Sequence, residues 1–241
     1  MSDNQGVRLN KYMAQAGLCS RREADKLIAE GKVCVNGSKA TMGTVVMPKD
    51  KVTVHGKHVK GAQDKVVLAF YKPVGVTCTE KDKYAKKTMK EYLNYSVRLT
   101  YAGRLDKDSE GLLLLTNDGD LINALMRGAN RHEKEYIVKV NKEITDSFIR
   151  DMGNGVYLKE LERTTRECEV EKIGKFTFKI ILTQGLNRQI RRMCEVFGYE
   201  VVSLKRIRIN GITLDKLTPG QTRAVVGAEL KALYESVGMK I

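Results

Sequence analysis

Apolar residues recur at helical spacing in two stretches near the start of the chain. The first stretch is residues 8–16, in which the apolar positions are Leu9, Tyr12, Met13 and Ala16. Side chains three and four positions apart share one face of a helix, so this stretch is predicted to be an amphipathic helix. The second stretch begins at Ser20, which forms a capping-box pattern with Glu23, and it is predicted to end at Gly31.

The pattern then changes from helical to alternating. Residues 32–37 predict a strand that ends in an Asn-Gly turn, and a further strand pair is expected around Val45 and residues 52–54. A short polar, glycine-bearing segment at 60–65 is predicted to be a linker. The chain is therefore divided into a small domain, residues 1–62, which combines a helix-turn-helix with a small β-sheet, and a larger domain, residues 66–241.

The larger region mixes strands and short helices. Strands are predicted at 66–71, 134–140, 169–171 and 176–182, and helices near 121–126, 145–152 and 188–197. Residues 112–116 fit either a buried strand or the start of a helix. Strands dominate while helices intervene, so the predicted fold class is α+β, with a mostly antiparallel sheet flanked by helices. The stretch after Gly220 gives no comparable signal.

Length and residue usage change this picture little. A chain of 241 residues that is 42% hydrophobic can bury the cores of two domains. Its five cysteines are odd in number and form no C-x-x-C pair, and its three histidines are scattered, so neither a disulfide framework nor a metal site is predicted. No leader pattern and no apolar run of about 18 residues is present, which predicts a cytoplasmic protein that does not enter a membrane.

Charge is more informative. The sequence has 43 Lys or Arg against 29 Asp or Glu, a formal net charge of +14. Such a surplus favours a polyanionic partner, because each cation placed on a phosphate releases condensed counterions. The alternative is a protein that is basic without having such a partner.

Part of this surplus falls on the two predicted N-terminal helices. Residues 1–64 hold 11 Lys or Arg and 6 Asp or Glu. The cations that avoid the apolar stripes are Arg8, Lys11, Arg21, Arg22 and Lys26. They can form one exposed basic face, although a solvated helix surface gives the same pattern.

Candidate chemistry begins at Asp106. This residue lies between Arg104 and Lys107, directly before a run of four leucines. A carboxylate among cations suggests a buried side chain that a guanidinium keeps ionised, as a carboxylate nucleophile requires. An exposed turn residue is the alternative, and spacing does not choose among the four nearby aspartates, Asp106, Asp108, Asp118 and Asp120.

A second candidate lies at the start of the helix expected after residue 187. Its apolar face consists of Ile190, Met193, Cys194 and Phe197, and the arginines Arg188, Arg191 and Arg192 are expected on the other side. With Asn187 as the N-cap, Arg188 falls in the first turn, where the helix dipole disfavours a cation. A locally unfavourable residue is expected where function sets the residue type, although Arg188 could equally be simply exposed.

Three separated motifs resemble those of the RNA pseudouridine synthases. They are Gly103-Arg-Leu-Asp106 followed by Asp108-Ser-x-Gly111, then Lys134-Glu-Tyr136, then Asn187-Arg-Gln-Ile-Arg-Arg-Met193. The segment from Leu9 to Gly37 resembles the S4 RNA-binding domain, which the rRNA-modifying branch of that family carries at its N-terminus. Together the motifs span residues 7 to about 212 in the order expected for that branch.

The resemblance implies roles for particular residues. Asp106 matches the catalytic aspartate, Tyr136 the tyrosine that packs against the target base, Arg188 the basic residue that pairs with the aspartate, and Arg104 a position that contacts RNA beside the flipped base. The full set of expected RNA-binding residues is Arg8, Lys11, Ser20, Arg21, Arg22, Lys26, Arg104, Lys107, Asn187, Arg191 and Arg192.

The implied reaction converts uridine to its C-glycoside without redox change or group transfer, so no cofactor or metal is expected. The implied substrate is a structured stem-loop of large-subunit (23S-type) ribosomal RNA, and a monomer is expected. Two alternatives stay open: the same reaction on tRNA, and an S4-bearing ribosome-associated factor that binds RNA without chemistry.

Overall fold

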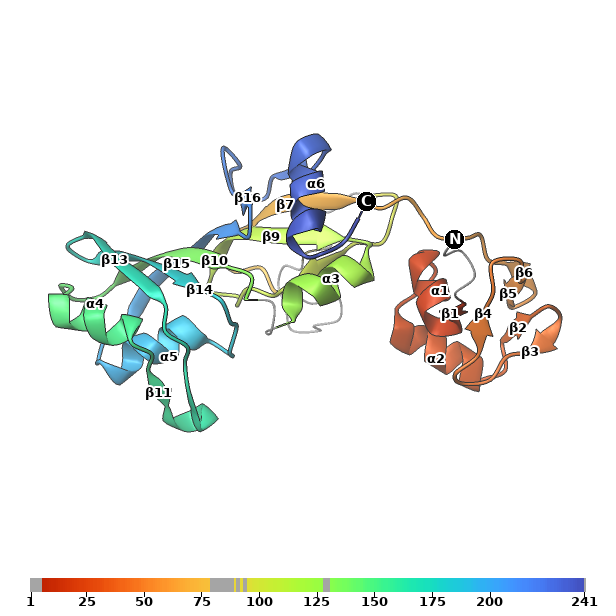
Figure 1. Cartoon of the computed structure of the whole chain (residues 1–241), viewed down its shortest axis with the longest axis horizontal. Helices are drawn as coiled ribbons and strands as arrows, with labels where there is room; N and C mark the ends of the chain where they lie inside the picture. The colour runs from red at the N-terminus through yellow and green to blue at the C-terminus, as the bar shows by residue number, and fades with distance from the viewer. Residues whose placement is uncertain (1–5, 79–88, 90–91, 93–94, 128–130, 241) are drawn as a thin grey trace. The chain divides into compact units, whose positions relative to one another are not determined.

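The computed structural model describes residues 6–78, 89, 92, 95–127 and 131–240. The chain forms two compact units: one reaches to Lys65 and includes Ser96–Arg98, and the other holds the remaining residues from Val66 onward (Figure 1). None of the helices in the described ranges is long and apolar enough to cross a membrane.

The first unit contains the predicted helix pair and a small sheet. The helices are α1 (Leu9–Gln15) and α2 (Arg21–Ala29). The sheet has the order β3 (Ser38–Lys39), β2 (Val33–Val35), β5 (Val52–Val54) and β6 (Lys57–His58), and a separate pair joins β1 (Val7–Arg8) to β4 (Val45–Val46). This arrangement confirms the prediction of a helix-turn-helix with a small β-sheet.

Local signals explain where these elements begin and end. The capping box at the start of α2 is complete: the Ser20 hydroxyl accepts from the Glu23 amide, and the Glu23 carboxylate accepts from the Ser20 amide. Asn36 and Gly37 both have positive φ, of 51° and 84°, as a tight hairpin turn requires. In the 60–65 segment, the Gln63 amide donates to the Gln15 carbonyl at 3.1 Å, so part of this segment is held against the end of α1.

The second unit is built on one large sheet. Its order is β13 (Glu169–Gly174), β14 (Thr177–Leu182), β10 (Lys134–Val140), β15 (Val201–Ile209), β9 (Glu110–Thr116), β7 (Val67–Lys72) and β17 (Thr222–Ala224), with β16 (Ile212–Thr213) beside β15 and β8 (Thr100–Ala102) beside β9. Every pairing among the described strands is antiparallel except that of β9 with β15. The predicted mostly antiparallel α+β sheet is therefore confirmed.

Helices cover both faces of this sheet. They are α3 (Gly119–Met126), α4 (Asp146–Gly153), α5 (Gln189–Val196) and α6 (Gly227–Ser236). The buried residues of α4 and α5 join one apolar cluster and those of α3 and α6 join another. Strand β9 is buried on both sides, because Leu113 and Leu115 belong to the first cluster while Leu112 and Leu114 belong to the second.

One small hairpin lies outside the large sheet. It consists of β11 (Tyr157–Leu158), a 3-10 turn at Lys159–Leu161 and β12 (Arg163–Thr164), and Figure 1 shows it projecting from the second unit beyond α5.

Candidate active site

Asp106 lies in the loop that joins β8 to β9. Gly103 opens this loop at a φ of 82°, and the Ser109 amide closes it by donating to the Asp106 carbonyl at 3.1 Å. The Asp106 side chain is 39% exposed. The expectation of a buried carboxylate is therefore wrong, because this tight turn leaves the Asp106 side chain partly exposed.

Arg188 directly precedes α5. It is the N-cap of that helix, with a left-handed backbone at φ 50° and no side-chain cap, so the predicted N-cap at Asn187 is wrong. The Asn187 side chain accepts a hydrogen bond from Arg192 at 3.5 Å instead. The left-handed turn directs the Arg188 side chain toward the Asp106 loop.

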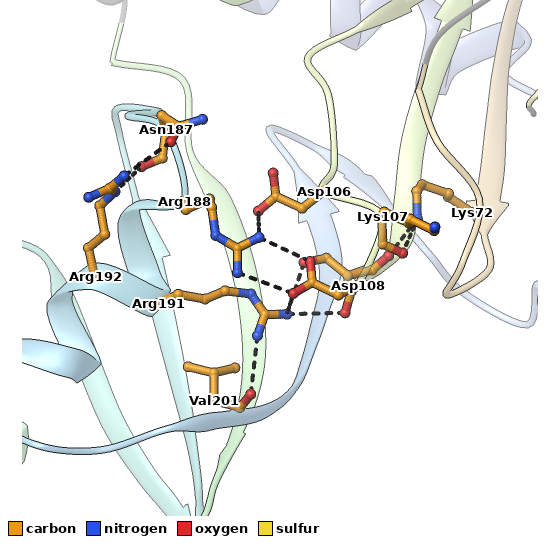
Figure 2. Close-up of polar contacts among 10 residues, drawn as sticks. Lys72, Asp106, Lys107, Asp108, Asn187, Arg188, Arg191, Arg192 and Val201 are labelled. Atoms are coloured by element: carbon orange, nitrogen blue, oxygen red, sulfur yellow. Dashed lines mark hydrogen bonds and ion pairs between the residues drawn. The ribbon is translucent and has the colours of Figure 1, made fainter. Parts of the chain in front are cut away.

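The Arg188 guanidinium lies between two carboxylates. Its distance to the Asp106 carboxylate is 3.7 Å, and its distances to the two Asp108 oxygens are 3.3 and 3.4 Å. Figure 2 shows that the Arg188 side chain points from the start of α5 toward both carboxylates. Asp108 is thus the closer partner of Arg188, and Asp106 keeps most of its accepting capacity for another molecule.

Arg191 contacts both the backbone carbonyl and the carboxylate of Asp108. It donates to the Asp108 backbone carbonyl and to the Val201 carbonyl, both at 3.1 Å, and it is buried (Figure 2). The expectation that Arg191 faces outward with Arg188 and Arg192 is wrong, since the turn between β8 and β9 requires a buried donor. Partial burial raises the pKa of Asp108, but the hydrogen bond from Arg188 and the charge of Arg191 outweigh it and leave that pKa below its usual value.

Tyr136 completes the group. It lies on β10, buried, and is paired in register with Ile180 on β14 and Arg206 on β15. Asp106, Tyr136 and Arg188 all line one cavity of about 550 Å³, which lies entirely in the second unit. The structure therefore brings the three expected catalytic residues around one space that is large enough to admit a nucleobase.

Comparison of the sequence with models of known protein families identifies the family to which the chain belongs. The RNA pseudouridylate synthase family matches residues 66–196, and the S4 domain family matches residues 7–52. The chain belongs to the RNA pseudouridine synthase family.

Relatives support this assignment along nearly the whole chain. The chain is similar to the dual-specificity RNA pseudouridine synthase RluF of Escherichia coli O157:H7, with 48% identity over 98% of this chain and 81% of the relative. It is also 36% identical to the ribosomal large subunit pseudouridine synthase B of Bacillus subtilis, over 94% of this chain and 95% of the relative. A solved structure of a pseudouridylate synthase superposes with a TM-score of 0.70 at 26% identity, covering 94% of this chain and 99% of that one.

The synthase domain also contains a buried lysine beside the Asp106 loop that the sequence analysis missed. Lys72, at the end of β7, is fully buried and donates to the backbone carbonyls of Pro73 at 2.8 Å, Ser109 at 2.6 Å and Lys107 at 3.5 Å. Burial lowers its pKa to about 8. Lys72 therefore holds the loop that carries Asp106, and the only sequence signal for it is a charge placed between an apolar run and Pro73.

Two further cations line the cavity, the buried Arg206 and the partly buried Lys134. Arg206 donates to the carbonyls of Leu112 at 2.7 Å and Gly103 at 3.4 Å, which ties β15 to β9 and to the start of the loop that carries Asp106. Lys134 lines the cavity, and burial together with the Arg206 charge lowers its pKa to about 8.

The expected RNA-binding residues occupy different environments. In the S4 domain, Arg8, Arg21, Arg22 and Lys26 are exposed, Lys11 is half-buried, and the Ser20 side chain is occupied in the capping box. In the synthase domain, Arg104, Lys107 and Asn187 are exposed, while Arg192 forms an ion pair with Glu160.

Among the described residues, no group of three or more His, Cys, Asp or Glu side chains is arranged to hold a metal ion. All five cysteines are free thiols.

Proposed function

We propose that this protein isomerises a specific uridine of large-subunit ribosomal RNA to pseudouridine, with Asp106, Tyr136 and Arg188 as its catalytic residues. The observation that carries the proposal is the single cavity in which all three side chains meet. A protein that only bound RNA would have no reason to hold a carboxylate, a buried tyrosine and a guanidinium around a space of this kind.

The reaction needs few groups. The N1–C1′ bond of uridine breaks, the base turns, and C5 bonds to C1′ while the hydrogen on C5 leaves and N1 gains a proton. No redox partner takes part. Attack of the Asp106 carboxylate on C1′ or on the ring, or removal of the 2′ proton by that carboxylate, would each begin this sequence.

The surroundings of Asp106 suit any of these steps. Arg188, at 3.7 Å, favours the ionised carboxylate when a bound base excludes water from the cavity. Tyr136 offers a flat face for the base and a hydroxyl for proton transfer. Because the cavity is recessed, the target uridine must leave its stack, at a cost of roughly a few kcal/mol.

The proposal that the substrate is ribosomal RNA is supported by the names of the relatives and by the S4 domain. One relative is named as a large-subunit pseudouridine synthase and another as a dual-specificity enzyme. The exposed cations Arg8, at the start of α1, and Arg21, Arg22 and Lys26, on α2, suit the shape-based recognition of folded RNA. We infer a monomer that works in the cytoplasm and needs no cofactor.

The test is nucleoside analysis after incubation of the purified protein with 23S-type rRNA, assembling large subunits and bulk tRNA. Pseudouridine is expected at one or a few positions in rRNA. Formation only in tRNA would replace the proposed substrate, and formation in none of the three would favour the S4-bearing binding factor.

A further inference from the structure

The projecting hairpin of residues 157–166, hereafter the arm, has no role in the account above. We propose that the arm binds the phosphates of the RNA strand next to the target uridine, through Arg163 and Arg166. This inference rests on the proposed function, because it assumes that a uridine of an RNA chain occupies the cavity.

The arm contributes Arg163 to the lining of the cavity. Arg163 is directly opposite Leu158, and residues opposite each other in an antiparallel pair share a face. Leu158 is buried and belongs to the apolar core of the synthase domain. Arg163 therefore faces the same side of the hairpin, and it lines the cavity together with Arg166.

The base of the arm is fixed to the domain. The Val156 amide donates to the Thr165 hydroxyl, and the Thr165 amide donates to the Val156 carbonyl, both at 2.9 Å and both between buried residues. Gly155 permits this closure, since its φ is 87° and a Cβ there would lie 2.7 Å from the Thr165 carbonyl. Arg163 thus extends from an anchored element.

The far end of the arm is tied to the catalytic helix. Glu160, in the 3-10 turn, forms an ion pair with Arg192 of α5, the helix that begins after Arg188. This pair also neutralises one of the two acidic side chains at the turn of the arm. The turn of the arm is therefore in contact with α5, the helix that begins directly after Arg188.

The charge of the cavity fits an RNA strand better than a lone base. Among the described residues that line it, Asp106 is the only carboxylate, whereas eight are lysines or arginines. Among the residues that the structure describes, the Arg163 side chain has no hydrogen-bond or ion-pair partner, and Arg166 donates to the Thr183 carbonyl at 3.2 Å. A uridine base carries no charge, so this excess of cations suits the phosphates on either side of it.

The experiment compares full-length wild type with Arg163→Gln and with the double variant Arg163→Gln, Arg166→Gln. The RNA is a fragment of the rRNA that wild type converts in the nucleoside assay. The Kd of each protein for this RNA fragment is measured at several salt concentrations, from low to moderate. Each substitution should weaken binding severalfold at low salt and reduce the salt slope by about one, and Arg163→Lys should restore the slope. Melting temperatures should match wild type, because Arg163 is exposed.

Arg150→Gln is the matched control. Arg150 lies on α4 of the same domain, its side chain is 68% exposed, and it is not among the residues that line the cavity. This variant should bind RNA as wild type does. Equal weakening by Arg150→Gln, or wild-type Kd and salt slope in the double variant, would overturn the role of the arm while leaving the enzyme assignment intact. Absence of pseudouridine with wild type itself would overturn the proposed function and the arm with it.

Discussion

At the scale of single residues, one guanidinium serves two carboxylates. Arg188 lies 3.3 Å from Asp108 and 3.7 Å from Asp106. Asp108 has two further contacts with Arg191, through its carbonyl at 3.1 Å and its carboxylate at 3.2 Å. We therefore interpret Asp108 as the residue that positions Arg188, and Asp106 as the carboxylate left for the substrate.

The lowered pKa of Lys134 predicts how the stability of the protein depends on pH. Its folded-state pKa is lowered from 10.5 to about 8, so between these values the unfolded chain binds more protons than the folded one. The cost of burying its charge is thus present below pH 8 and is relieved above it. The free energy of unfolding of wild type, relative to that of Lys134→Met, should rise by about 1 kcal/mol from pH 7 to pH 9.

Urea titration at the two pH values measures this difference. Lys139→Met is the control, because Lys139 lies on the same strand and is exposed. The difference between wild type and this control should not change with pH. A flat result for Lys134→Met would mean that the lysine is solvated in the folded protein.

The sequence predicts some of these residues better than others. Its motifs point to Asp106, Tyr136 and Arg188, which the structure brings to one cavity. It does not predict that Lys72 is buried, because its three carbonyl acceptors come from a loop more than 30 residues away as well as from its own turn. Such cations become recognisable only when the sheet brings distant carbonyls together.

At the scale of elements, the loop that carries Asp106 is followed by a close approach of two strands. Gly111 follows the loop on β9 and pairs with Arg206 on β15. Its φ is 106°, and a Cβ there would lie 2.2 Å from the Arg206 carbonyl oxygen. No side chain fits between these strands, so glycine is required at this point of the parallel pairing.

Gly111→Ala should therefore destabilise the protein by about 3 kcal/mol or more, through backbone strain and steric overlap. Urea unfolding measures the change. Gly211→Ala is the control, since a Cβ at Gly211 meets nothing within 4 Å and its unfolding midpoint should stay close to that of wild type. A stable Gly111→Ala protein would show that β9 and β15 can separate without loss of the fold.

The hydrophobic pattern of the sequence predicts helices and strands correctly where buried residues recur at a regular spacing. Helices α1 and α2 have apolar stripes and clear ends, and the structure contains both. Strand β15 was missed because it carries Ser203, Lys205, Arg206 and Arg208 inside the sheet, where Arg206 is buried by its bonds to β9 and to the loop that carries Asp106. Helix α6 was also missed, and its start has no side-chain cap.

At the scale of the whole molecule, positive charge is the shared property of both units. The S4 domain presents exposed cations on α2, and the cavity of the synthase domain has a single carboxylate among the residues described there. Each unit can thus contribute separately to the affinity for one polyanion. The electrostatic contribution should appear in the salt dependence of binding.

Replacing Arg21, Arg22 and Lys26 by Gln in the full-length protein tests the share of the S4 domain. These side chains are exposed, so the fold should persist, while the salt slope of rRNA binding should fall by up to about three. Filter binding over a range of salt concentrations measures this slope.

The control for this variant removes the same charge elsewhere. The positions are Lys216, Lys231 and Lys240, which are exposed in the second unit and do not line the cavity. This control should keep the wild-type slope. Equal losses in both proteins would indicate that net charge alone governs binding, and would remove the specific role of α2.

The central claim is that Asp106, and not its neighbour Asp108, carries out the reaction. The most direct measurement is tritium release from rRNA labelled at C5 of uracil, because forming the C5–C1′ bond must expel that hydrogen. Wild type should release tritium, Asp108→Asn should release it more slowly, and Asp106→Asn should release none while binding RNA with wild-type affinity. Release by Asp106→Asn, or its complete loss in Asp108→Asn alone, would contradict this account.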